Sequence, residues 1–243
     1  MHMLYIILSD IHSNLQALEA VIESFPQKDN IAVICVGDIV GYGANPMQCL
    51  DIIRRLNARC VLGNHDAAVV NRMDISRLNE HALDAIIWTK AHTNRIDMRY
   101  FDYLPYTFTN DLFTMVHGTL NDPEEFNYLT TNPDAEKTFK LLKTRICFVG
   151  HTHRPGVFME RAGIVHPLFR KKFTIEDDAK YIINVGSVGQ PRDYDNRASY
   201  CTYSPENNEI EFRRIEYDIK SAKKAISDAG LPKMLGDRLL IGQ

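Results

Sequence analysis

The chain has 243 residues, of which 45% are hydrophobic and 24% are charged, a composition that predicts a folded globular protein with a substantial core. Its formal net charge is -3, with 28 basic residues scattered among 31 acidic ones, so long nucleic acid is not favoured as a partner. No apolar run approaches the roughly 18 residues of a membrane span, and the five cysteines without a C-x-x-C pair favour a reducing, cytoplasmic compartment.

Short β-rich runs alternate with helical patterns in the first third of the chain. Residues 4–8 have the pattern of a buried strand, and a helix follows behind a capping box that starts at Ser13. A second strand at 31–36 leads to a helix that begins near Pro46, and a third strand follows at 60–62. Strands joined through helices in this way run parallel, so the sequence predicts a parallel sheet here.

A helical insert at residues 76–104 separates these elements from a second half that is rich in strands. We expect further strands at 112–116, 146–149, 156–159, 164–166, 181–185, 199–203 and 209–215, a helix at 218–229, and a short helix beyond Pro232. Two sheets flanked by helices, in a single domain over residues 1–243, accommodate these elements.

Five of the predicted strands end in small polar clusters that contain aspartate, asparagine or histidine. The clusters are Asp10 with His12, Asp38, Asn64 with His65 and Asp66, His117, and His151 with His153. The carboxyl ends of strands in α/β sheets converge on one crevice, and glycines at 37, 63, 118 and 150 permit close backbone approach there. In extended backbone, residues two apart point to the same face, so the D-x-H and H-x-H pairs would each aim two side chains at one cavity.

Each of these polar residues alone has an ordinary explanation as a turn residue, a helix cap or a hydrogen-bonded histidine. Together they would place many uncompensated polar groups at one sheet edge, which is costly unless cations neutralise them. Carboxylate oxygens and imidazoles without thiolate suit Mn²⁺, with Fe, Co or Zn as alternatives. The set therefore predicts a pair of divalent transition-metal ions.

The motifs D-x-H, G-D, G-N-H-D, H-G and G-H-T-H, in this order, closely resemble those of the calcineurin-like metallophosphoesterase superfamily. Segments 41–46 and 184–193 resemble a bacterial branch described as phosphodiesterase or diadenosine tetraphosphatase-like, so the resemblance covers nearly the whole chain. It implies a four-layer α/β/β/α sandwich of two mixed sheets flanked by helices, with the metal site at the carboxyl ends of the strands.

The resemblance also implies a role for each matching residue. Asp10, His12 and His153 would hold one metal, Asn64, His117 and His151 the other, and Asp38 would bridge them, which leaves His65 free to assist the leaving group. Two ions about 3.5 to 4 Å apart hold a bridging hydroxide for in-line attack on a phosphate.

Four further residues are candidates for roles beside the metals. Arg192 and Arg197 have the planar fork that binds two phosphate oxygens, although a solvated loop arginine is an equal alternative for Arg192. Tyr42, between two glycines, would stack on a base or pack over its loop. Asp66 would accept a hydrogen bond from His65 and orient it, or would cap a helix. A lid role for the insert at 76–104 is left open, because the sequence gives its position in the chain and not its contacts.

The leading functional hypothesis is hydrolysis of a phosphodiester or dinucleoside polyphosphate in the cytoplasm. The expected partner is a small phosphorylated substrate such as a nucleotide. We expect no membrane partner, and a homo-oligomer is left open. A protein serine/threonine phosphatase or another phosphomonoesterase is the first alternative. Protein phosphatases resemble this chain in the metal ligands but carry G-D-x-x-D-R-G, and the arginine is missing between Gly37 and Gly43. A non-catalytic interaction scaffold is the second alternative, which the complete ligand set disfavours.

Overall fold

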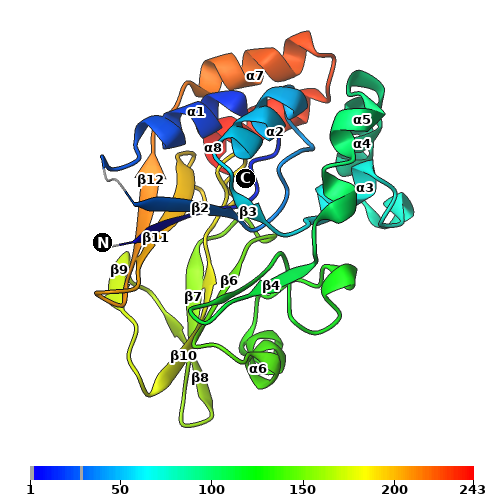
Figure 1. The fold of residues 1–243 in the computed structure, drawn as a ribbon. Helices are drawn as coiled ribbons and strands as arrows, with labels where there is room; N and C mark the ends of the chain where they lie inside the picture. The colour runs from blue at the N-terminus through cyan, green and yellow to red at the C-terminus, as the bar shows by residue number, and fades with distance from the viewer. Residues whose placement is uncertain (1–2, 28–29) are drawn as a thin grey trace.

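The computed structural model describes residues 3–27 and 30–243 and contains two six-stranded mixed sheets (Figure 1). The first sheet has the order β3-β2-β1-β11-β12-β9. Its parallel part comprises β1 (Leu4–Leu8), β2 (Ile31–Cys35) and β3 (Arg59–Cys60), and its antiparallel part β11 (Ala198–Ser204), β12 (Glu209–Ile215) and β9 (Lys172–Thr174). The parallel strands are those predicted from the strand and helix alternation.

The second sheet has the order β4-β5-β6-β10-β7-β8. Its strands are β4 (Thr107–Thr109), β5 (Thr114–Val116), β6 (Ile146–Val149), β7 (Gly156–Arg161), β8 (Ile164–Leu168) and β10 (Ala179–Asn184). Strand β6 pairs in parallel with β5 and β10, and the outer strands pair antiparallel.

Helices cover the outer faces of both sheets, so the fold has four layers, as the resemblance implied (Figure 1). The helices α1 (Leu15–Glu23), α2 (Pro46–Arg55), α7 (Ile219–Asp228) and α8 (Lys233–Ile241) lie beside the first sheet, and α6 (Asn132–Leu141) covers the second. The burial of strand β1 explains why residues 4–8 are apolar throughout. Ile6 and Leu8 pack toward the helices, whereas Ile7 packs with Phe148 between the sheets, so both faces of the strand are buried.

The predicted insert is helical but broken into short pieces. After α3 (Asn64–Val69) come η1 (Ile75–Arg77), α4 (Glu80–His92), α5 (Arg95–Met98) and η2 (Phe101–Tyr103). Asn79 and Asn94 interrupt the pattern because each caps a new helix, with its side-chain oxygen accepting from Ala82 N and Asp97 N respectively. The Trp88 indole donates to Ala229 O at 2.8 Å, which fastens α4 to the end of α7.

Local details differ from the sequence-based expectation at helix α1, at helix α6 and at strands β4 and β9. Helix α1 is capped by Asn14, whose Oδ1 accepts from Ala17 N at 3.1 Å, and not by Ser13, which has a left-handed backbone. Helix α6 and the three-residue strands β4 and β9 were not predicted. Within the described part of the chain, no helix is long and apolar enough to cross a membrane.

Candidate metal centre

The polar clusters predicted from the sequence converge at one edge of the two sheets. Asp10 and His12 follow β1, Asp38 follows β2, Asn64 begins the helix after β3, His117 follows β5, and His151 and His153 follow β6. All seven side chains are buried, with exposed fractions between 0% and 7%. Residues from five separate regions of the chain therefore meet in one buried polar site.

One group of candidate ligands contains Asp10, His12 and His153, whose ligand atoms lie within 4.8 Å of one another. The His153 Nε2 is 3.3 Å from Asp10 Oδ1 and 3.0 Å from His12 Nε2. These are the three residues that the resemblance assigns to one metal.

A second group contains Asp38, His117 and His151. The His117 Nε2 lies 3.3 Å from Asp38 Oδ2 and 3.2 Å from Asn64 Oδ1. Asp38 Oδ2 is also 3.6 Å from His12 Nε2, so this carboxylate lies between the two groups. A third overlapping group joins Asp38 and His12 to His65.

The imidazoles of His12 and His153 have their ring protons fixed by the backbone. The Nδ1 of His12 lies 3.2 Å from Val40 O, and that of His153 lies 2.6 Å from Gln190 O. A carbonyl oxygen only accepts, so each Nδ1 carries the proton and each Nε2 presents a lone pair. Two lone pairs 3.0 Å apart repel unless a cation lies between them, and the donor set thus fits a metal ion.

The backbone at the ligands is left-handed, which corrects the expectation of extended backbone. The φ angles are 52° at Asp10, 48° at His12, 55° at Asp38, 67° at His151 and 59° at His153. Strands β1 and β6 end at Leu8 and Val149, before the ligands begin. The D-x-H and H-x-H pairs do aim at one site, but through strained turns, which occur at functional sites.

Glycine is required at two positions against the ligands. A Cβ at Gly63 would lie 2.1 Å from Asp38 Oδ1, and one at Gly150 would lie 2.5 Å from Asp10 Oδ2. Any side chain there would displace a carboxylate of the site, as the sequence-based argument on close approach expected.

The segment that follows β10 holds the ligand loops in place, a role that sequence reasoning missed. The Asn184 side chain donates to Gly150 O at 2.6 Å and to Thr152 Oγ1 at 2.9 Å. The Ser187 hydroxyl donates to Asp10 O at 2.7 Å. The available signal was a strand ending in a run of small polar residues, like those that carry the ligands.

Asp66 does not make the hydrogen bond to His65 that we expected. Its Oδ1 accepts from the backbone amides of Ile39 and Val40 at 2.9 and 3.1 Å, so it holds the loop that carries Asp38. It also accepts from the Gly63 amide at the start of α3, in agreement with the capping alternative. The His65 Nδ1 has no hydrogen-bond partner among the described residues.

Of the three substrate-side candidates, two lie at the site. Arg192 lines the cavity in front of the ligands, donates to Gln190 Oε1 and lies over the Tyr42 ring at 5.6 Å. Tyr42 is buried and packs on the His65 ring, with ring centroids 4.4 Å apart. Of its two expected roles, the structure therefore favours packing over stacking on a base. Arg197 is not among the residues that line the cavity, and its guanidinium pairs with Asp195 at 2.7 Å, so the structure does not place it at the site.

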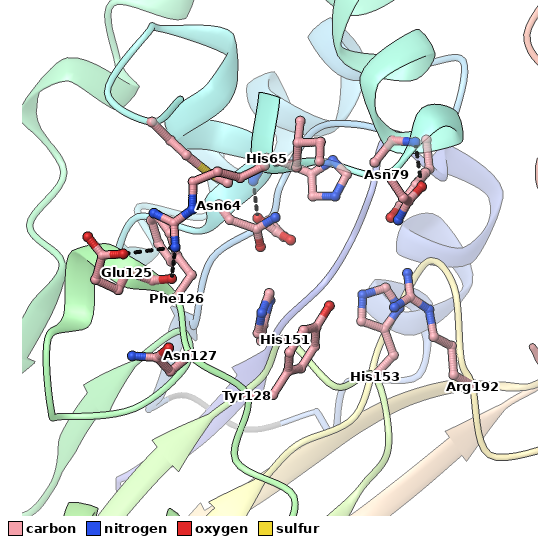
Figure 2. Close-up of a pocket in the computed structure, with 16 residues that line it drawn as sticks. Asn64, His65, Asn79, Glu125, Phe126, Asn127, Tyr128, His151, His153 and Arg192 are labelled. Carbon is pink, nitrogen blue, oxygen red and sulfur yellow. Dashed lines mark hydrogen bonds and ion pairs between the residues drawn. The ribbon is translucent and has the colours of Figure 1, made fainter. Parts of the chain in front are cut away.

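The cavity has a volume of about 250 Å³ and is open to solvent. Figure 2 shows His151 and His153 on one side of the cavity and Asn79 of the insert on the other. The insert contributes Arg77, Leu78, Asn79 and Ala82 to the lining, and Met73, just before it, also lines the cavity. It therefore forms a wall of the site.

The chain matches the model of the calcineurin-like phosphoesterase superfamily domain over residues 3–208. It belongs to this superfamily. The chain is 39% identical over 242 residues to an uncharacterized protein of Methanocaldococcus jannaschii, MJ0912, with 98% of this chain and 97% of that protein covered. A metallophosphoesterase from Sphaerobacter thermophilus is 34% identical and has a TM-score of 0.87 over the whole of both chains. A putative diadenosine tetraphosphatase shares the fold at 16% identity and a TM-score of 0.55, with 88% and 94% of the chains covered.

Burial sets the protonation of most imidazoles in this phosphoesterase site. It lowers the pKa of His65 to about 4 and that of His151 to about 3, and it lowers the pKa values of His12 and His153 as well. These rings are neutral near pH 7 and have lone pairs available. Burial alone would raise the pKa of Asp38, but the neighbouring histidines outweigh it, so that carboxyl stays ionised.

Metal binding to this superfamily member should strengthen as the pH rises. Burial and the Asp38 charge raise the pKa of Asp10 to about 7. Burial would lower the pKa of His117, but the carboxylates of Asp38 and Asp10 raise it to about 9. Both groups must lose a proton to ligate, so the affinity for Mn²⁺ should rise about tenfold per pH unit between pH 7 and 9, and more steeply below pH 7. Calorimetry across pH 6 to 9 tests this, and an affinity independent of pH would contradict it.

Proposed function

We propose that the protein hydrolyses a phosphodiester or a dinucleoside polyphosphate with two divalent transition-metal ions, Mn²⁺ being the first choice. The observation that carries this proposal is the pair of ligand groups that meet at Asp38, with bare imidazole nitrogens facing one another. When bound, such ions polarise the phosphoryl group and lower the pKa of water toward 7. Six side chains around Asp38 would hold them: Asp10, His12 and His153 on one side, and Asn64, His117 and His151 on the other.

The remaining side chains at the cavity supply substrate contacts. The side-chain Oε1 of Gln190 accepts from Arg192 and its backbone oxygen accepts from His153 Nδ1, so the guanidinium fork is positioned relative to the ligands. His65 lines the cavity and is neutral at pH 7, so a ring N–H is available to donate to the leaving oxygen. Together these groups would bind the phosphate and help the alcohol or phosphate to depart.

The shape of the site favours a small substrate over a phosphoprotein. A cavity of about 250 Å³ with the insert as one wall accommodates a nucleotide-sized group, whereas a folded protein surface would have to displace the insert. Trp88 ties that insert to the C-terminal helices, which opposes such a movement.

A substrate screen in Mn²⁺ tests the proposal. We expect metal analysis to give two ions per chain, and we expect hydrolysis of nucleotide diesters or diadenosine tetraphosphate to exceed that of phosphomonoesters and of a phosphopeptide. The Asp38→Asn variant is the blank for contaminating activity. A preference for the phosphopeptide would favour a protein phosphatase, and an absence of both metal and hydrolysis would favour a scaffold.

A further inference from the structure

The loop that follows His117 presents an aromatic side chain to the cavity. The Tyr128 ring stacks on the ring of His151, with centroids 4.0 Å apart and an angle of 20° between the planes. Tyr128 is nevertheless 55% exposed, so His151 covers one face of its ring and the opposite face is open. Figure 2 shows the two side chains together on the lower side of the cavity.

The conformation of this loop is held by several independent contacts. Asp122 and Phe126 have left-handed backbone, with φ of 50° and 51°, which is costly for residues other than glycine. Phe126 is buried, and Glu125 forms an ion pair with Arg77 of the insert at 2.8 Å. The buried Phe126 and the Glu125–Arg77 ion pair thus hold the loop that carries Tyr128.

The apolar side chains of Met73 and Leu78 line the same cavity as Tyr128. Two amide side chains also line the cavity. The Asn79 oxygen accepts from Ala82 N, whereas its NH₂ group has no partner among the described residues. The side chain of Asn127 likewise makes no hydrogen bond within the described part of the chain.

We propose that this part of the cavity binds the planar base of a nucleotide ester, stacked on the open face of Tyr128 and facing Met73 and Leu78. The amides of Asn79 and Asn127 are placed to contact the edges of the base. An aromatic face gives stacking to any base, so the subsite requires a planar group more than a particular base. The volume of about 250 Å³ admits one such group. This inference rests on the proposed phosphoesterase function, and it makes Tyr128 a substrate-binding residue.

Two esters that share a scissile bond and differ only in the base test the subsite: the methyl ester of adenosine 5′-monophosphate and the methyl ester of ribose 5-phosphate. Tyr128→Leu should raise KM for the adenosine ester about tenfold, with kcat unchanged and with KM for the ribose ester altered less than twofold. Tyr128→Phe should behave as the wild type because the stacking ring is kept. Tyr103→Leu, which removes an exposed tyrosine outside the cavity, is the matched control.

An equal loss on both esters would mean that Tyr128 only supports His151, and no change on either would mean that no base binds there; both results overturn the inference. Calorimetry keeps the test independent of turnover. Adenosine 5′-monophosphate should bind the wild type about tenfold more tightly than the Tyr128→Leu variant, whereas ribose 5-phosphate should not distinguish them. If the wild type cleaves neither ester nor bis-p-nitrophenyl phosphate in Mn²⁺, the proposed function fails, and equal binding of both monophosphates would overturn the base subsite separately.

Discussion

Asp38→Asn should remove bound metal and reduce phosphoesterase activity by at least about 10⁴-fold. Asp38 lies within 3.6 Å of His12 Nε2 and within 3.3 Å of His117 Nε2, so its charge serves both ligand groups. Lowering the pKa of water from about 16 to about 7 is worth on the order of 12 kcal/mol, and this contribution depends on the ions. Metal content by atomic spectrometry and kcat/KM for a diester are the two measurements.

The substitution is conservative for the fold. Asp38 Oδ1 accepts from the His65 backbone amide at 2.9 Å, and an asparagine oxygen can accept the same bond. Asp111→Asn, at an exposed carboxyl away from the cavity, controls for charge loss alone. An Asp38→Asn protein that retains two ions would contradict the bridging position.

His65→Ala should keep the metal and lose activity in proportion to how poor the leaving group is. The neutral His65 ring would donate a hydrogen bond to the leaving oxygen, which is worth at most what general-acid assistance gives, about 10² to 10⁴ in rate or roughly 3 to 5 kcal/mol, and p-nitrophenolate needs little of it. We expect a loss of that size for alkyl esters and a loss of less than about tenfold for bis-p-nitrophenyl phosphate. The comparison of the two substrates is the measurement.

Metal analysis of His65→Ala is the essential control, because His65 also lies close to Asp38 and His12. The His65 backbone N–H that donates to Asp38 survives the substitution, and the unpartnered Nδ1 means that no hydrogen bond from that atom is lost. His166→Ala, at an exposed histidine of β8 that does not line the cavity, is the matched histidine variant. Loss of metal equal to that in Asp38→Asn would make His65 a ligand.

The positions of the seven candidate ligands could be predicted because strand ends and polar clusters coincide in the sequence. The local reason was nevertheless wrong for Asp10 with His12 and for His151 with His153, where left-handed turns and not strand alternation bring the pairs together. A spacing of two residues is compatible with both backbone conformations. Each pair therefore points into one site as predicted, although the predicted backbone conformation was wrong.

Contacts between distant segments could not be predicted. Nothing in the sequence near Tyr128 signals that it stacks on His151, because the loop conformation depends on Phe126 burial and on Arg77 in the insert. The roles of Asp66 and Asn184 depend in the same way on backbone groups of other loops. The strands β4 and β9 are only three residues long, too short for a periodic pattern to appear.

The bond from the Trp88 indole to Ala229 O links the wall of the cavity to the opposite end of the chain. The residues that would hold metal come from loops at strand ends. The wall of the cavity, in contrast, includes helix α4, which packs against α7 and α8. The candidate ligands and the cavity wall thus have separate structural supports. On the proposed function, substitutions in the last two helices would change which esters bind without altering the metal ligands.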